Sequence, residues 1–149
     1  MKLLVATIAL MMTGAADAAA QPVQRYAAPS FAGAPPPFSK AVRVGDSLYL
    51  SGVIGRTADG KVPDGIEAQT KAAMNDIGAT LITAGLSYGD VFHCTVFLTD
   101  MKNWPAFNKI YVGYFPAGGL PARSAIGVTA LALPGALTEI ECQAYAGKK

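Results

Sequence analysis

The spacing of apolar residues between residues 66 and 84 places the strongest constraint on how this chain folds. Small or aliphatic side chains recur there at helical intervals: Ile66, Thr70, Ala73, Ile77, Leu81 and Ala84. Gly85 follows as a natural helix end. Asp64 and Glu67 have the spacing of a capping box, so we expect the helix to begin there. A helix with such a small apolar face is suited to lying flat on a sheet.

Strand patterns lie on both sides of this helix. Residues 41–44 and 48–50 flank a turn at Gly45-Asp46 and predict a hairpin, and residues 91–98, 125–130 and 137–146 predict further strands. Asn103 is a candidate N-cap for a second helix that ends before Pro116. We interpret the aromatic stripe of this helix as core: Phe107, Ile110, Tyr111 and Tyr114.

The order strand, strand, helix, strand, helix, strand, strand predicts an α+β fold. Two helices of this length can cover one face of a single sheet. The other face would still carry Val, Ile and Phe side chains, and an uncovered apolar sheet face usually marks a subunit interface. The pattern therefore predicts an oligomer.

The first 37 residues differ from the rest of the chain. Residues 1–20 have the plan of a secretory signal peptide, with basic Lys2, an apolar run over 3–12 and small residues before Ala20. The apolar run is too short for a permanent membrane span. We expect an exported protein, periplasmic or secreted, without a span after cleavage. Residues 21–37 hold five prolines and should form an extended, poorly packed lead, and residues 38–149 should form one domain.

Charge and cysteine content narrow the function classes. The net charge is +2 and the chain has no cluster of Lys and Arg, which argues against nucleic acid or anionic membranes as partners. With one histidine and no CxxC pair, the spacing of a metal site is missing. Cys94 and Cys142 lie on different predicted strands. They can form a disulfide if those strands are neighbours, or remain two buried thiols.

Two segments near the C-terminus carry the candidate chemistry. Arg123 stands at the entrance of an apolar strand, and a guanidinium can bind a carboxylate with two parallel N–H donors. Glu139 and Glu141 alternate with apolar residues, so both carboxylates should share one strand face. A carboxylate near the arginine could orient or activate a water. The alternative, which residue types alone favour, is an Arg–Glu ion pair at a sheet edge.

Six motifs follow one another in a fixed order: Ala41-Val42-Arg43-Val44-Gly45, Ser51-Gly52, Phe97-Leu98-Thr99-Asp100-Met101, Tyr114-Phe115, Pro121-Ala122-Arg123-Ser124 and Glu139-Ile140-Glu141. In this combination the chain resembles the RidA/YjgF family of enamine and imine deaminases, over about residues 37–146. The resemblance implies a chorismate-mutase-like α+β subunit with a mixed sheet. It also implies a homotrimer whose sites lie in the clefts between subunits.

The resemblance further implies residue roles. The position of Arg123 would bind the substrate carboxylate, and that of Glu139 would hold a water for attack on an imine carbon. The positions of Ser51, Gly52 and Asn108 would line or support the pocket. Phe38 stands where the family commonly has tyrosine, and Ala125 where it often has cysteine, so both are candidate substrate contacts.

The implied reaction is that of a 2-iminobutanoate/2-iminopropanoate deaminase. A 2-imino acid, formed from its enamine, would be hydrolysed to a 2-keto acid and ammonia without cofactor or metal. The alternative is a non-catalytic trimeric binder of small carboxylate metabolites in the cell envelope, which Phe38 and the leader favour. A ribonuclease activity, as in some relatives of this family, is disfavoured because the chain lacks a basic groove.

Overall fold

The computed structural model describes residues 22–30 and 33–147, so the expected signal peptide lies outside the described residues. The strands are β1 (Gln24–Ala27), β2 (Ser39–Val44), β3 (Ser47–Leu50), β4 (Val53–Ile54), β5 (Val91–Leu98), β6 (Ala122–Gly127) and β7 (Thr138–Tyr145). The α-helices are α1 (Ile66–Thr83) and α2 (Trp104–Tyr111), and short 3-10 helices are η1 (Tyr88–Asp90), η2 (Met101–Asn103) and η3 (Val112–Tyr114). Over the described ranges, none of the helices is both long and apolar enough to span a membrane.

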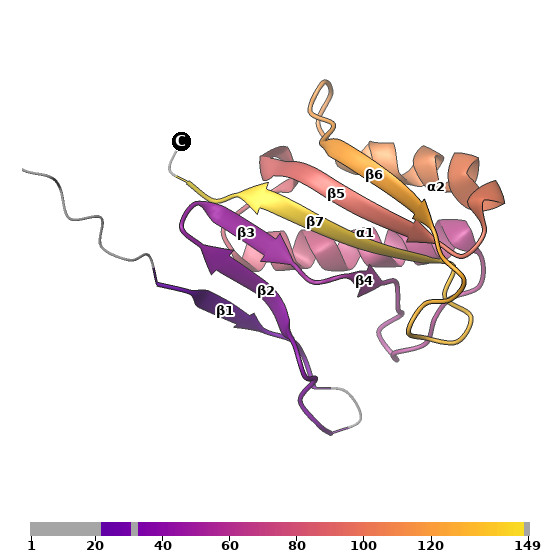
Figure 1. Ribbon diagram of the computed structural model, residues 1–149, viewed down its shortest axis with the longest axis horizontal. Helices are drawn as coiled ribbons and strands as arrows, with labels where there is room; N and C mark the ends of the chain where they lie inside the picture. The colour runs from indigo at the N-terminus through magenta and orange to yellow at the C-terminus, as the bar shows by residue number, and fades with distance from the viewer. Residues whose placement is uncertain (1–21, 31–32, 148–149) are drawn as a thin grey trace, which may run out of the picture.

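All the strands belong to one mixed sheet, in the order β1-β2-β3-β7-β5-β6, with β4 also paired to β7. Neighbouring strands are antiparallel except β5 and β6, which run parallel. A parallel pair needs a crossover connection, and the segment that contains α2 supplies it. Both α-helices lie on the same face of the sheet, which confirms the predicted α+β architecture (Figure 1).

The core lies between α1 and the two central strands. On β5 and β7 the apolar side chains that face the helices are buried: Cys94, Val96, Leu98, Ile140, Cys142 and Ala144. The α1 stripe fills the space above them, with Ala73, Ile77 and Leu81 fully buried as predicted. The buried side chains therefore alternate along the strands and recur every three or four residues along α1, and the two sets pack against each other.

The start of α1 differs from the predicted capping box. The N-cap is Gly65, with φ 81°, and no side chain caps the helix. Positive φ at a glycine turns the chain into the helix one residue later than expected, so Asp64 stands outside the N-cap position. Buried Gln69 fixes this end instead. It donates to the carbonyls of Pro63 and Gly135 and accepts from the Leu137 N–H.

Asn103 likewise fails as the predicted side-chain cap of α2. It occupies the N-cap position of α2 but makes no side-chain capping hydrogen bond. The carboxylate of Asp100 instead accepts from the Lys102 N–H and caps η2, which runs directly into α2. The chain therefore receives its cap one turn earlier than the sequence indicates.

The proline-rich lead is better ordered than we expected. Residues 24–27 form β1, which pairs antiparallel with β2 and covers what would be an exposed strand edge. Backbone groups of an uncovered edge strand remain unpaired, and a non-proline segment of suitable length can satisfy them. Pro22 and Pro29 lie just outside this strand, where the missing N–H groups do no harm.

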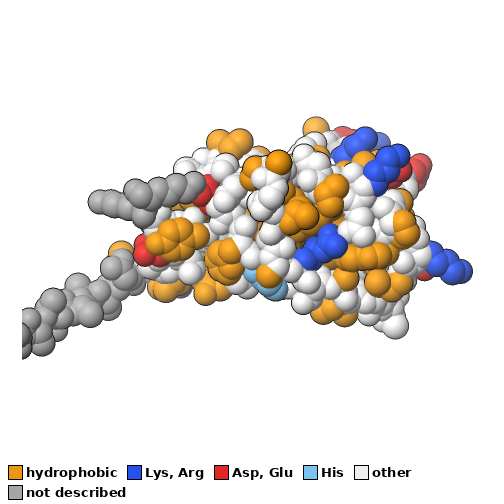
Figure 2. All heavy atoms as spheres, turned by 90° about the horizontal axis from the view of Figure 1, so that it is seen from above, with side chains coloured by type: hydrophobic (Ala, Val, Ile, Leu, Met, Phe, Trp, Pro, Cys, Tyr) orange, Lys and Arg blue, Asp and Glu red, His pale blue; other side chains and the backbone are white. Residues whose placement is uncertain are grey.

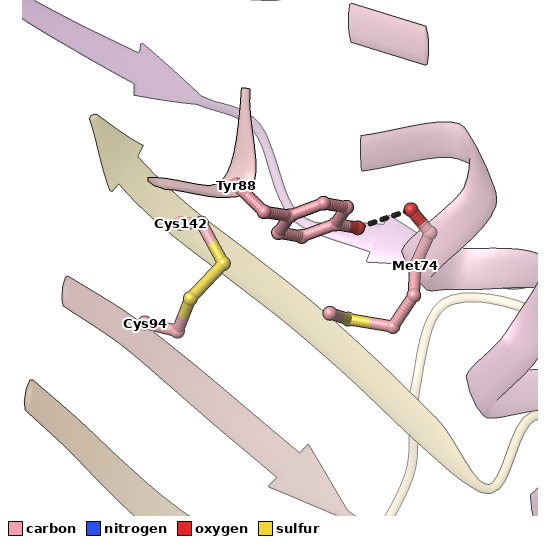
Figure 3. The surroundings of a disulfide bond; sticks show 4 residues. All are labelled: Met74, Tyr88, Cys94 and Cys142. Atoms are coloured by element: carbon pink, nitrogen blue, oxygen red, sulfur yellow. Dashed lines mark hydrogen bonds between the residues drawn. A yellow bond between two sulfur atoms is a disulfide. The ribbon is translucent and has the colours of Figure 1, made fainter. Parts of the chain in front are cut away.

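Cys94 and Cys142 form a disulfide, which decides between the two alternatives left open by the sequence. The residues are directly opposite each other on β5 and β7, with 4.1 Å between their Cα atoms. Figure 3 shows the bond joining the two strands beside Tyr88, whose hydroxyl donates to the Met74 carbonyl of α1. The bond is buried within the core.

The disulfide closes a sequence separation of 48 residues. A cross-link of this span restricts the unfolded chain, so its removal should lower the free energy of unfolding by roughly 2–4 kcal/mol. Urea denaturation with and without a thiol reductant measures the difference. The Cys94→Ala/Cys142→Ala double variant is the control, because its midpoint should not respond to the reductant. An unchanged midpoint for the reduced wild type would contradict the prediction.

Candidate functional site

Glu139 and Glu141 lie on the sheet face opposite the helices. Their neighbour Ile140 is fully buried against α1, while both carboxylates are partly exposed. This confirms that the two glutamates share one strand face. Glu139 is opposite Ile54 of β4 and Phe97 of β5 in the strand register.

A cavity of about 540 Å³ opens beside Glu139. Of the predicted site residues, Phe38, Ser51 and Gly52 line it together with Glu139. Phe38 directly follows the proline-rich lead, Ser51 and Gly52 form the connection between β3 and β4, and Glu139 belongs to β7. Segments far apart in the sequence thus form one concave surface.

Gly52 makes room for the Glu139 carboxylate. A Cβ atom at this position would lie 2.0 Å from Glu139 Oε1, so any side chain there would force the carboxylate to move. Ser51 has a different task. Its hydroxyl donates to the Ser39 carbonyl at 2.7 Å, and its N–H donates to the Lys40 carbonyl, so it ties the cavity wall to β2.

The environment of Glu139 raises the pKa of its carboxyl above the ordinary value. Partial burial is the main cause, because it disfavours the charged form, and the negative charge of Glu141 adds to it. A carboxylate with a raised pKa is a better proton acceptor than an ordinary one. Glu139 is therefore suited to take a proton from a water in the cavity.

Arg123 is held on the other side of the sheet. It is in register with Cys94, so it faces the helices, and its guanidinium carbon lies 4.4 Å from the Trp104 ring centroid and 4.6 Å from that of Tyr111. These cation–π contacts fix the plane of the guanidinium. Of the aromatic stripe that the sequence predicts as core, Phe107 and Tyr111 are buried, whereas Ile110 and Tyr114 are half-buried. Tyr111 also contacts the Arg123 guanidinium through the face of its ring.

Three buried polar atoms near this guanidinium have no hydrogen-bond partner among the described residues. They are Arg123 Nη1, Asn108 Oδ1 and Tyr111 Oη. Asn108 lies one helical turn from both Trp104 and Tyr111, on the stripe that faces Arg123. Buried polar groups are normally satisfied, so such a cluster indicates a place for a polar ligand. Burial also raises the pKa of Tyr111 to about 12, an effect that nearby Arg123 partly offsets.

Arg123 and Glu139 do not meet within one chain, because they project from opposite faces of the sheet. The predicted alternative of an Arg–Glu ion pair is wrong for the described part of the chain, where the salt bridges are Lys40–Asp76 and Lys61–Asp59. Ala125 lies two residues beyond Arg123 and shares its face. The site residues therefore form two half-sites: Phe38, Ser51, Gly52 and Glu139 in one, and Asn108, Arg123 and Ala125 in the other.

The sequence analysis assigns no role to Trp104 and describes Tyr111 only as a core residue, although both rings contact the Arg123 guanidinium. Together with Asn108 they have i, i+4, i+7 spacing, which would have placed them on one helix face. Among the described residues no three His, Cys, Asp or Glu side chains gather in a way that could hold a metal ion.

Comparison with known proteins places the chain in a family. The family model described as Endoribonuclease L-PSP matches residues 29–146. The chain belongs to this family, also known as RidA/YjgF. A mouse relative named 2-iminobutanoate/2-iminopropanoate deaminase is 39% identical over 113 residues, which cover 74% of this chain and 82% of the relative.

Two further relatives support this family assignment. The chloroplastic Reactive Intermediate Deaminase A of Arabidopsis thaliana is 39% identical over 108 residues, covering 71% of this chain and 57% of the plant protein. A crystal structure of a Rid-family protein from Yersinia pestis is 36% identical and superposes with a TM-score of 0.75, covering 83% of this chain and 99% of that one. The RidA/YjgF fold therefore extends over the whole described domain.

Replacing Gly52 with alanine should displace the Glu139 carboxylate without unfolding the protein, because the clash involves the end of a side chain. Moved into solvent, the carboxyl should titrate at a lower pH than in the wild type, since burial is the main cause of its raised pKa. Carboxyl-carbon NMR titration of Glu139 measures the shift. Gly113→Ala is the control, because nothing lies within 4 Å of a Cβ there. Identical titration of Glu139 in the Gly52→Ala variant and the wild type would contradict this role of Gly52.

Proposed function

We propose that this RidA/YjgF protein hydrolyses 2-imino acids to 2-keto acids and ammonia. The observation that carries the proposal is the half-buried Glu139 carboxyl with its raised pKa at the wall of a cavity. The names of the mouse and plant relatives give the reaction class. A protonated imine next to a carboxylate needs little more than a fixed anion, a positioned water and a proton acceptor.

The proposed steps use groups of this chain alone. Arg123 binds the substrate carboxylate through the N–H groups of its guanidinium, which the aromatic rings of Trp104 and Tyr111 hold in one plane. Water attacks the imine carbon as Glu139 accepts a water proton. Glu139 then returns this proton to the nitrogen of the tetrahedral adduct, and takes up the hydroxyl proton as the carbon–nitrogen bond breaks and the carbonyl forms. The products are the keto acid and ammonia, which leaves with that proton as ammonium.

The two half-sites come together when two copies of the chain associate. Because Arg123 and Glu139 face opposite sides of the sheet, a site that contains both must take them from different copies. The helix-free face exposes large apolar side chains that a partner could cover, including Tyr49 and Tyr145. Figure 2, which views the molecule from above, also shows hydrophobic side chains over much of this surface, with basic side chains between and beside them. We infer the homotrimer that the family resemblance implies.

We further infer that the protein acts outside the cytoplasm. The leader pattern of residues 1–20 supports export. The Cys94–Cys142 disulfide supports it independently, because such bonds form and persist in oxidising compartments.

A non-catalytic binder of small carboxylates is the second candidate. It is favoured by Phe38, a residue that is 56% exposed and lines the cavity without the hydroxyl that a tyrosine would bring. Such a protein would keep the anion-binding role of Arg123 and lack turnover.

Hydrolysis is tested with 2-imino acids generated in situ by an amino-acid oxidase. The wild type should accelerate imine loss, and Arg123→Ala should lose about 100-fold or more in kcat/KM, because it removes a charge-assisted bond to the substrate. Lys109→Ala is a matched control, since it removes an exposed cation from the same region of the molecule. Carboxylate binding without imine loss would favour the binder, and turnover that survives Arg123→Ala would refute the assigned anchor.

The shared site is tested by mixing two inactive variants. Arg123→Ala keeps Glu139, and Glu139→Gln keeps Arg123, so each mixed trimer formed on co-expression has one intact site of three and should show about a third of the wild-type activity. Each variant expressed alone should remain inactive. Purification through two different tags selects the mixed species. A mixture that stays as inactive as the single variants would show that the two residues do not act in one shared site.

A further inference from the structure

We propose that the N-terminal lead gives this site a preference for 2-imino acids with large apolar side chains, branched aliphatic or aromatic, over those with a methyl group. This inference rests on the proposed function and concerns the same cavity. It defines the class of substrate by the side chain of the imino acid, which takes no part in the reaction.

The cavity wall around Glu139 is built mainly from apolar residues. The lead contributes Ala28, Pro29, Ala34 and residues 35–37, which no strand of the central sheet could supply. The β6–β7 connection adds Ala132 and Leu133, and β4 adds Val53 and Ile54. A surface of this composition stabilises hydrocarbon and offers few hydrogen bonds to a polar side chain.

The lead is held in place as part of the sheet. β1 is paired with β2 from Gln24 opposite Arg43 to Ala27 opposite Ser39, and Tyr26 packs against the core. The three consecutive prolines at 35–37 restrict the backbone just before Phe38. The wall is therefore preformed on both sides of residues 31–32, and a preformed pocket binds with a smaller loss of entropy.

Charged groups of the lining also fit an apolar substrate. Lys40 and Asp76 form a salt bridge at 2.5 Å, so each neutralises the other. Arg56 lines the cavity as well and has interactions within the protein. The carboxylate anchor of the proposed reaction is Arg123, outside this lining. The remaining space is thus available to the substrate side chain.

The size of the cavity also favours substrates with large side chains. A volume of about 540 Å³ lies in the range that accommodates drug-sized ligands and greatly exceeds the need of a three-carbon imino acid.

The test compares imines derived from alanine, leucine, phenylalanine and glutamate, using the full chain. We expect kcat/KM for the leucine and phenylalanine imines to exceed that for the alanine imine by tenfold or more, since each buried methylene contributes roughly tenfold discrimination. Calorimetric titration with the corresponding stable 2-keto acids should show the same order of affinity. This second measurement does not depend on turnover.

Two pairs of variants locate the subsite. Ala28→Trp should fill the cavity and reduce kcat/KM for the two large imines about tenfold or more, with little effect on the alanine imine. Ala27→Trp is its control, because this neighbouring exposed residue does not line the cavity. On the β6–β7 connection, Ala132→Trp and its control Ala130→Trp form the second pair, both at exposed positions.

The outcomes separate this inference from the proposed function. Turnover with equal efficiency for all imines, or a preference for the alanine or glutamate imine, would overturn the subsite and leave the deaminase standing. Absence of turnover with ordered keto-acid binding would refute the deaminase and support the subsite. Absence of both would overturn both. Loss of the preference in Ala28→Trp together with a changed oligomer mass would show that a second copy, and not the substrate, occupies this wall.

Discussion

The antiparallel pairing of β5 with β7 is the constraint on which the rest of the structure depends. It sets Cys94 opposite Cys142 and Phe97 opposite Glu139, and it gives α1 the apolar face on which the helix packs. β6 then adds to β5 in parallel, so the position of Arg123 follows from the same register. A shift of one residue would move Glu139 into the core and expose Ile140. Both half-sites are therefore fixed by the hydrophobic effect acting on their neighbours.

This arrangement separates two charges that would otherwise neutralise each other. Arg123 is held by cation–π contacts on the helix side, and Glu139 retains a raised pKa on the open side. An ion pair within the chain would lower the pKa of the carboxyl and occupy the guanidinium. Keeping them on opposite faces leaves the guanidinium and the carboxyl unpaired within the chain. In the proposed function, association of copies is the step that brings the two groups to one site.

Much of the fold could be predicted because it follows from local periodicity. The α1 stripe, the alternation of Glu139 with Ile140 and the order of elements are patterns that residues show in sequence. The face of Arg123 could not be predicted, since it depends on the parallel register of β6 against β5. Pairing of β1 with β2 was also hidden, because proline content outweighed four residues of ordinary strand propensity. What remained unpredictable was long-range register.

The position of the disulfide has a consequence for how the chain matures. Cys142 lies in β7, the last of the described strands in chain order, while its partner Cys94 lies in the earlier strand β5. A nascent or truncated chain that lacks β7 leaves Cys94 without its partner and the middle of the sheet open. This disulfide can therefore form only after β7 has been inserted between β3 and β5. A chain that carries this bond has a complete sheet, and Glu139, which lies on the same strand as Cys142, is then in its final position.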